Sequence, residues 1–323
     1  MVVLTGSLGA LVDAYAQVLA SKAPGTTDAY LRALRQFITW LAQRPAGVGY
    51  LRPEQLTKTA VETYLAHLRA TGYSVSTQAR AKAAISGFAQ WLIEEQELLQ
   101  RNPTRGVALP AQPLLAPRQL SPDQRYVLRE LVERDGAARS AALFALGYWA
   151  GCRVSDVSWL RREDVHSGPK VGWVHVGYKG GKARDLDLVN QARRPLQQYL
   201  VEQAEGRAHN GHGNDDANGS EERYFLFTSQ RSARLTERGI HHWLQRLRER
   251  ATKVEWDLVG DVTYHDLRHD FAHRAREAGW TLEEVAYYLG HVTNKGTPAI
   301  QTTVRYTQVS REQVREKLRL LQG

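Results

Sequence analysis

A ten-residue stretch of this sequence concentrates side chains that could bind a phosphate. Residues 265–274, HDLRHDFAHR, hold three of the 11 histidines in the 323-residue chain, together with two arginines. On a helix, His265, Arg268 and His269 would share one face, because residues three and four apart are neighbours. Guanidinium and imidazole groups gathered there could encircle one phosphate. Taken alone, however, such a segment is more typical of a solvated helix with one core histidine.

A zinc site is the second chemistry that this spacing permits. Two histidines four residues apart bind zinc in the HExxH pattern, in which the glutamate acts as a base. The position that would carry the glutamate holds Asp266 or Leu267, and Arg268 on the same face would repel a cation. We therefore expect no metal ion at this helix.

Four residues elsewhere complete an ordered pattern. Arg153 lies in AGCRVSDV, Lys179 in YKGGKAR, His291 directly after an LG pair, and Tyr306 in TTVRYTQV. With HDLRH, the set reads R…K…HxxR…H…Y, and it resembles the tyrosine recombinase (phage integrase and Xer) family over nearly the whole chain. HDLRH and LGH…RYT are the motifs most specific to this family. The Arg153 motif is less specific, and the lysine hairpin is the least specific.

The resemblance implies a nucleophile and a cationic cradle. Tyr306 would attack a DNA phosphodiester and form a covalent 3′-phosphotyrosyl link. A phenol with a pKa of roughly 10 needs help in losing its proton, and the phosphorane-like transition state needs nearby positive charge. Arg153 and Arg268 would each present a planar fork to the non-bridging oxygens. Tyr287 and Tyr288 are rival tyrosines, which we expect to be packing residues.

The same resemblance assigns the proton transfers. His265 or His291 would donate to the phosphate or accept the tyrosine proton, since imidazole titrates near neutrality. Lys179 would be the general acid for the departing 5′-oxygen, with Lys182 as a phosphate contact and a rival for the acid role. Guanidinium and imidazole would take the role of metal ions, and the phosphotyrosyl link would keep the phosphodiester activated. No metal and no other cofactor is therefore expected.

Two further residues are expected to support the site. Asp156, three residues after Arg153, stands where glutamate is usual in the family and would have a shorter reach for a buttressing role, and His269 would support its helix through a hydrogen bond. The interval from His291 to Tyr306 is longer than is common, so the resemblance leaves the shape of segment 292–305 open. The second hairpin strand, RDLDL, lacks the proline of the common RxVPL pattern. None of these departures removes a catalytic group.

The helical patterns fall into two groups separated by prolines. Apolar residues recur at 3.6-residue spacing, with Thr or Ser at many starts and Gly or Pro at many ends, in segments 11–21, 26–44, 57–72, 74–96, 121–135, 137–160, 236–251, 263–279, 281–290 and 310–321. Five prolines between Asn102 and Pro122 favour an extended connection. We predict a helical N-terminal domain at 1–108, a Pro-rich linker at 109–120 and a second domain at 121–323. The family resemblance implies that these are a SAM-like core-binding domain and an α+β catalytic domain.

The second domain also contains a different periodicity. Segments 171–178 and 183–189 alternate in the manner of strands, and the KGGK sequence between them is typical of a hairpin turn. The fold class is therefore mainly α with a small antiparallel β-sheet. Segment 205–222 is polar and rich in Gly and Asn, which predicts a flexible surface loop. Its two histidines are better explained by a solvated loop than by a metal site, because no further ligand is near.

Basic residues of the first domain are candidate DNA contacts. In this family the two domains clamp opposite faces of the duplex, which points to Arg80 and Lys82 as phosphate contacts, with Arg32 and Arg35 as weaker candidates. A solvated helix face explains them almost as well. The last helical segment, 310–321, carries an apolar stripe that could dock on a neighbouring copy, so self-association on DNA is expected. The same stripe could equally fold back on its own domain.

Composition is consistent with this hypothesis but does not establish it. The net charge of +9 and the pI near 9.6 fit a nucleic-acid partner, although many basic proteins bind none. No run approaches the ~18 apolar residues of a membrane span, and the N-terminus lacks the pattern of a secretory signal, so we expect a cytoplasmic protein. Cys152 is the only cysteine, which excludes an intrachain disulfide, and we expect it to be buried as a small hydrophobic residue.

Three functions compete at this level. The first is a site-specific recombinase, of the Xer type or a mobile-element integrase, that acts on double-stranded DNA carrying a specific site, with a partner recombinase or accessory protein as an option. The second is an enzyme in the style of a type IB topoisomerase, which relaxes DNA as a monomer. The third is a DNA-binding regulator that has the fold but no cleavage activity. Retention of every catalytic residue type argues against the third.

Overall fold

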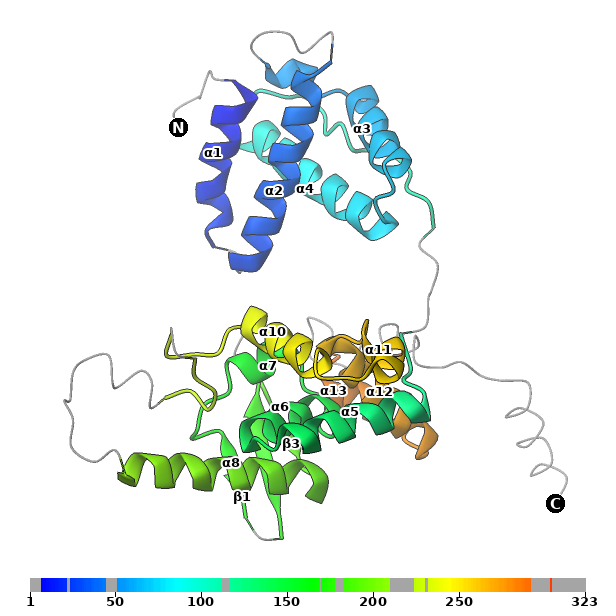
Figure 1. The fold of residues 1–323 in the computed structure, drawn as a ribbon. Helices are drawn as coiled ribbons and strands as arrows, with labels where there is room; N and C mark the ends of the chain where they lie inside the picture. The colour runs from blue at the N-terminus through cyan, green and yellow to red at the C-terminus, as the bar shows by residue number, and fades with distance from the viewer. Residues whose placement is uncertain are drawn as a thin grey trace, which may run out of the picture. The chain divides into compact units, whose positions relative to one another are not determined.

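The computed structural model describes residues 7–21, 24–44, 51–111, 117–168, 170–177, 183–209, 224–229, 232–291 and 303 (Figure 1). The chain divides into two compact units, Met1–Pro113 (unit 1) and Leu114–Gly323 (unit 2). Within the described ranges, no helix is long and apolar enough to cross a membrane.

Unit 1 is built from packed amphipathic helices. They are α1 (Leu8–Leu19), α2 (Pro24–Ala42), the short 3-10 helix η2 (Pro53–Gln55), α3 (Lys58–Ala70) and α4 (Val75–Glu94). Helix α2 packs against α1, α3 and α4, and the shared core includes Phe37, Tyr64 and Phe88. The side chains of Ser7, Thr57 and Ser74 each accept a backbone hydrogen bond at a helix start. Because caps and periodicity are local signals, the predicted segments agree with these helices to within about one turn.

Unit 2 combines helices with one small sheet. The helices are α5 (Pro122–Asp135), α6 (Ala138–Tyr148), α7 (Val154–Ser158), α8 (Asn190–His209), α10 (Glu237–Arg248), α11 (Lys253–Val259), α12 (Tyr264–Glu277) and α13 (Leu282–Leu289). The antiparallel sheet has the order β1 (Val165–Ser167), β2 (Gly172–Val176) and β3 (Arg184–Asp187). The predicted fold class, mainly α with a small antiparallel sheet, is confirmed.

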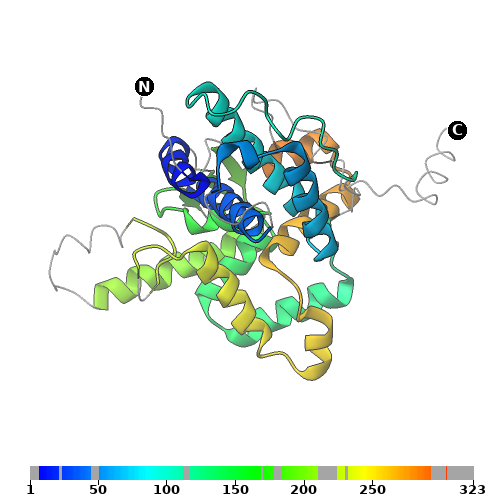
Figure 2. The same cartoon turned by 90° about the horizontal axis from the view of Figure 1, so that it is seen from above.

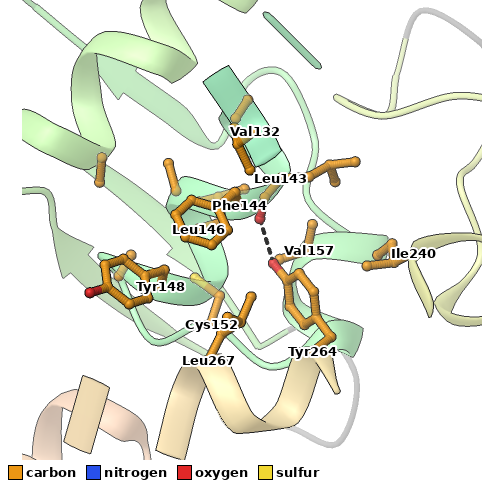
Figure 3. Close-up of a cluster of buried hydrophobic side chains, with 14 of the residues drawn as sticks. Val132, Leu143, Phe144, Leu146, Tyr148, Cys152, Val157, Ile240, Tyr264 and Leu267 are labelled. Carbon is orange, nitrogen blue, oxygen red and sulfur yellow. Dashed lines mark hydrogen bonds between the residues drawn. The ribbon is translucent and has the colours of Figure 1, made fainter. Parts of the chain in front are cut away.

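Helix α6 forms the centre of unit 2. It packs against α8 and also against α12, and the later part of α8 projects from the rest of the unit in both views (Figures 1 and 2). The hydroxyl of Tyr264, the first residue of α12, donates a 2.8 Å hydrogen bond to the carbonyl of Leu143 inside the core (Figure 3). A Cβ atom at Gly147 of α6 would lie 2.8 Å from the Tyr264 ring, so this close approach depends on glycine. The start of α12 is therefore held tightly against α6.

Several elements differ from the sequence predictions. Segment 137–160 is not one helix, because the chain turns between α6 and α7 at Gly151, whose φ is +60°. Helices α8 and α11 and strand β1 were not predicted. The predicted loop 205–222 is wrong at its start, since α8 continues to His209, and its remainder lies outside the described residues, as does segment 310–321. Cys152 is 1% exposed, as expected, and burial raises the pKa of its thiol to about 12.

The last residues of the predicted linker pack on α12. The His273 ring and the Pro117 carbonyl are 2.9 Å apart, and the amide of Leu120 donates to Asp270 Oδ1 at 3.1 Å. Asp270 is fully buried and also pairs with Arg125 and Arg274. Residues 117–120 are thus anchored to unit 2, while the domain limits 1–108, 109–120 and 121–323 stay a prediction.

Candidate active site

Helix α12 presents the HDLRH motif from a well-defined start. Thr263 and Asp266 form a capping box, in which the Thr263 amide donates to Asp266 Oδ2 at 2.8 Å and the Thr263 hydroxyl accepts from the Asp266 amide. This places His265 in the first turn and His269 one turn later. Their rings meet edge to face with centroids 4.1 Å apart. Desolvation lowers the pKa of both imidazoles, that of His269 to about 3, and Arg268 adds to both shifts.

The guanidinium of Arg268 is buried and bonds to two backbone carbonyls. The side chain is 1% exposed, and its Nη1 donates to Gly151 O at 2.7 Å while Nη2 donates to Leu289 O at 2.7 Å. A buried cation is costly unless hydrogen bonds replace its water. These bonds therefore stabilise Arg268 and, in doing so, tie α12 to the α6–α7 turn and to the end of α13.

Three arginines converge on consecutive carbonyls at the C-terminus of α13. Arg184 Nε donates to Tyr288 O at 3.0 Å, Arg268 to Leu289 O, and Arg153 Nη2 to Gly290 O at 3.0 Å. The last carbonyls of a helix lack partners within the helix and carry partial negative charge. Three cations from three different segments are thus held around one helix end, in the region that leads into His291.

Gly290 allows the chain to turn at this point. It adopts a left-handed conformation with φ +66°, and its amide closes the helix by bonding to Tyr287 O. A Cβ atom here would lie 2.9 Å from Arg184 Nη1. Glycine is therefore required both by the backbone conformation and by the close approach of the arginine.

Asp156 connects two of the arginines. Its Oδ2 accepts from the backbone amide of Arg153 at 3.1 Å and from Arg184 Nη2 at 3.0 Å. The carboxylate is 6% exposed and belongs to the capping box that starts α7. Asp156 thus fixes the backbone position of Arg153, as a buttressing residue would.

The protonation state of His291 follows from its partners. Arg268 Nη2 lies 3.0 Å from His291 Nε2, and a guanidinium can only donate, so Nε2 accepts. The other ring nitrogen, Nδ1, lies 3.1 Å from the hydroxyl of Thr303 and carries the proton of the neutral ring. Desolvation, followed by the charges of Arg268, Arg153 and Arg184, lowers the pKa of His291 to about 3. His291 is therefore a neutral imidazole in this arrangement.

Acidification is expected to destabilise unit 2 because of these imidazoles. His269 and His291 have pKa values of about 3 in the folded protein, whereas an unfolded histidine titrates near pH ~6.5. Between these pH values the unfolded chain binds more protons than the folded chain. The contribution of the two imidazoles to the free energy of unfolding is therefore fully present above pH ~6.5 and is lost as the pH falls. The melting temperature should drop between about pH 7.5 and about pH 5. His269→Asn should make the drop smaller, and an equal drop in this variant would contradict the explanation.

The structure brings together part of the predicted site. Arg153, Arg268 and His291 meet at the end of α13, and Asp156 contacts Arg153 directly. His265 lies near enough for Arg268 and Arg153 to lower the pKa of its imidazole. The other predicted catalytic residues, Lys179 and Tyr306, fall outside the described residues, as does Lys182.

The predicted DNA contacts of unit 1 differ in their surroundings. Arg80 is exposed and lines a hollow of about 780 Å³ between α2 and α4, together with Arg32 and Arg35. Lys82 is half-buried and donates a 2.6 Å hydrogen bond to the carbonyl of Val107. Lys82 therefore joins α4 to the segment that follows it, which is a structural role that the sequence did not suggest.

Two residues of the site were missed in the sequence. Thr303 is fully buried against His291, and only its proximity to Tyr306 could have drawn attention to it. Arg184 was visible through strand alternation, because it shares one face of β3 with Leu186, a buried residue. A charged residue in phase with a buried one signals an internal ion pair, which here is Arg184 with Asp156.

This arrangement is suited to binding and transforming a phosphodiester. Planar guanidiniums can stabilise charge on non-bridging oxygens, and their fixed positions spare the reorganisation that water would need. Neutral imidazole groups at the same place can accept or relay a proton.

Comparisons with known proteins agree with the site. Residues 119–313, more than half of the chain, match the phage integrase family, and residues 12–97 match the phage integrase N-terminal SAM-like domain. The chain is 29% identical over 311 residues to the tyrosine recombinase XerC of Neisseria meningitidis serogroup C, a match covering 93% of this chain and 92% of the relative. It is 31% identical over 297 residues to the tyrosine recombinase XerD of Ralstonia nicotianae, covering 91% and 86%.

A solved structure shares the fold. The integrase of the transposon Tn1549, in complex with a circular intermediate DNA, superposes with a TM-score of 0.70 at 16% identity and covers 98% of this chain and 99% of the integrase chain. The assignment to a family rests on the family matches and the Xer relatives, because the match to the solved structure shows the fold alone. The chain belongs to the phage integrase family of tyrosine recombinases, which break and rejoin DNA.

Proposed function

We propose that this protein is a site-specific recombinase that cleaves DNA through Tyr306. The tyrosine oxygen attacks the scissile phosphorus, the 5′-oxygen leaves, and a 3′-phosphotyrosyl link forms. A 5′-hydroxyl from a partner strand then attacks this link, which rejoins the DNA and releases the tyrosine. The observation that carries the proposal is the convergence of Arg153, Arg268 and His291 at the end of α13.

Arg153 and Arg268 form the proposed cradle for the phosphate. Each is held by a backbone carbonyl at the end of α13, which orients the guanidinium before DNA arrives. Preorganised donors of this kind commonly contribute about 10²–10³-fold to a rate. Arg153 is the more accessible of the two, being only half-buried, and so is placed to receive the phosphate first.

The imidazoles and Lys179 carry the proposed proton transfers. His265 is exposed at the start of α12 and can approach a bound phosphate or the tyrosine. His291 is neutral, and its Nε2 carries a lone pair that faces the arginine cluster. Either ring can therefore serve as acceptor of the tyrosine proton. Lys179, or Lys182 in its place, protonates the departing 5′-oxygen in this proposal.

The contact between His291 and Thr303 supports Tyr306 as the nucleophile. Thr303 is anchored to the site by its hydroxyl, and three peptide units separate it from Tyr306. Three residues span at most about 11 Å between Cα atoms. This short connection supports the proposal that Tyr306 reaches the arginine cluster.

The proposed partner is double-stranded DNA with a specific recombination site. The Tn1549 integrase, which shares this fold, was solved with a circular intermediate DNA. We infer that Arg80, Lys82 and Lys182 contact phosphates, although Lys82 would first have to release Val107 O. We also infer self-association on DNA, with a partner recombinase or an accessory protein as an option, and a cytoplasmic location. The biological role is either Xer-like or that of a mobile-element integrase.

The test is a search for the covalent intermediate. The full chain is incubated with a pool of nicked duplexes that carry a randomised central segment, so that cleavage releases a short strand and traps the adduct. A denaturant-resistant adduct is expected, and mass spectrometry of its peptides should locate the nucleotide on Tyr306. Attachment at another residue, or no adduct from the whole pool, would refute the proposal. Joint molecules between two recovered duplexes distinguish recombination from simple relaxation.

A further inference from the structure

Arg184 has no role of its own in the reaction proposed for Tyr306. It begins β3, five residues after Lys179, and its side chain is 12% exposed. Nε donates to Tyr288 O at 3.0 Å and Nη2 to Asp156 Oδ2 at 3.0 Å. Among the described residues Nη1 has no hydrogen-bond partner, and it is buried against Gly290.

These contacts close a ring around the end of α13. Arg184 bonds to Asp156, Asp156 bonds to the amide of Arg153, and Arg153 bonds to the carbonyl of Gly290. The backbone then leads from Gly290 back to Tyr288, whose carbonyl accepts from Arg184. The start of α7, the start of β3 and the end of α13 are therefore locked together by one side chain.

We propose that Arg184 is a positioning residue for strand cleavage, which holds Arg153 and the α13–His291 turn in the arrangement that receives the phosphate. The inference rests on the proposed function, because cleavage is what the positioning serves. Arg184 acts through Asp156 and Tyr288 O, and its own guanidinium is too deeply buried to meet DNA.

Lysine cannot replace arginine in this role. The planar guanidinium reaches Asp156 and Tyr288 O at the same time with separate nitrogens, whereas an ammonium is a single point on a flexible chain. Arg184→Lys keeps the charge and removes the fork. A misplacement of catalytic groups by about 1 Å can cost roughly 10²-fold in rate.

A matched control exists in the same unit. Arg193 is 8% exposed, and its guanidinium likewise spans two acceptors, Gly168 O at 2.9 Å and Asn190 Oδ1 at 2.7 Å. It lies on α8 and, within the described part of the chain, its guanidinium makes no hydrogen bond or ion pair with the arginine cluster. Arg193→Lys therefore reproduces the loss of a buried fork without touching α13.

The first measurement is hydrogen exchange in the full chain without DNA. The amide of Gly290 donates to Tyr287 O at 3.0 Å, and that of His291 to Ala286 O at 2.8 Å. Arg184→Lys should speed exchange of both amides by roughly tenfold or more, because hydrogen bonds to a charged group are lost. Arg193→Lys should leave them unchanged. Unchanged exchange in Arg184→Lys would overturn the proposal, and this outcome does not depend on cleavage.

The second measurement is single-turnover adduct formation with the duplex recovered from the randomised pool. Arg184→Lys should lower the rate at saturating DNA by about 10²-fold, with little change in the DNA concentration that gives half of that rate. In an Arg153→Lys background, Arg184→Lys should lower the rate much less, because the effect of Arg184 on the rate passes through Arg153. Full additivity, or a weakened affinity alone, would overturn the proposal. If the wild type forms no adduct while the exchange result holds, the cleavage function fails and the anchoring of α13 stands.

Discussion

Tyr306→Phe is expected to abolish the covalent protein–DNA adduct while leaving DNA binding intact. The substitution removes only the oxygen that is proposed to attack and keeps the aromatic ring. Removal of a nucleophile that acts with its partners commonly costs roughly 10⁶-fold. The adduct should therefore disappear from a denaturing gel of labelled duplex, while a native gel shows an unchanged complex.

The two rival tyrosines provide the controls. Tyr287 is 76% exposed on α13, so Tyr287→Phe removes a tyrosine hydroxyl without disturbing the core. The Tyr288 hydroxyl donates to Asp187 O at 3.0 Å, and burial raises the pKa of this phenol, which makes it a poor nucleophile. Both Phe variants should still form the adduct. An adduct that persists in Tyr306→Phe, or vanishes in Tyr287→Phe, would contradict the assignment.

Arg268→Ala should have the second largest effect. An arginine that stabilises the transition state of phosphoryl transfer can be worth about 10³–10⁵-fold, and adduct formation should slow on this scale. The substitution also leaves the carbonyls of Gly151 and Leu289 without a donor, at about 1–3 kcal/mol for each buried group. A thermal denaturation curve therefore has to accompany the rate, and both are measured well below the melting temperature of the variant.

A neutral phosphate separates chemistry from folding. A methylphosphonate at the scissile position carries no negative charge, so it needs less compensation from a cation. With this substrate Arg268→Ala should recover a large part of the lost rate, whereas a folding defect would persist on either substrate. The Arg193→Lys variant should react at the wild-type rate with the phosphodiester and with the methylphosphonate. Failure of the methylphosphonate to rescue Arg268→Ala would mean that Arg268 serves only to hold α12, Gly151 and Leu289 together.

Long amphipathic helices were predictable because their signals are local. Helix α12 is capped by Thr263, whose capping box with Asp266 involves only four consecutive residues. Elements without such signals were missed. Strand β1 has three residues, too few to show alternation, and α8 contains Pro195 and has only a weak apolar stripe. Helix α11 has seven residues, which are too few for a helical period to repeat.

The candidate site was predictable in its residue types and less so in its contacts. The order of Arg153, His265, Arg268, His291 and Tyr306 pointed to phosphoryl transfer before any fold was known. Strand alternation places Arg184 on the same face of β3 as the buried Leu186, but it does not reveal which partners Arg184 meets. A buttressing role was expected for Asp156 without a named partner, and in the structure Asp156 accepts hydrogen bonds from the amide of Arg153 and from Arg184.

Local patterns were thus enough to predict the long amphipathic helices, two strands of the small sheet, the family and candidate side chains for a phosphate, because caps, periodicity and motif order are properties of neighbouring residues. Long-range packing alone set the acceptors of those side chains. Arg268 meets Gly151 O, 117 residues away, and Arg153 meets Gly290 O, 137 residues away. Every residue carries the same backbone carbonyl, so the residue types do not indicate which carbonyl an arginine will bond to. That choice depends on how α12 and α13 pack beside α6 and α7, and it also settles that His291 is neutral.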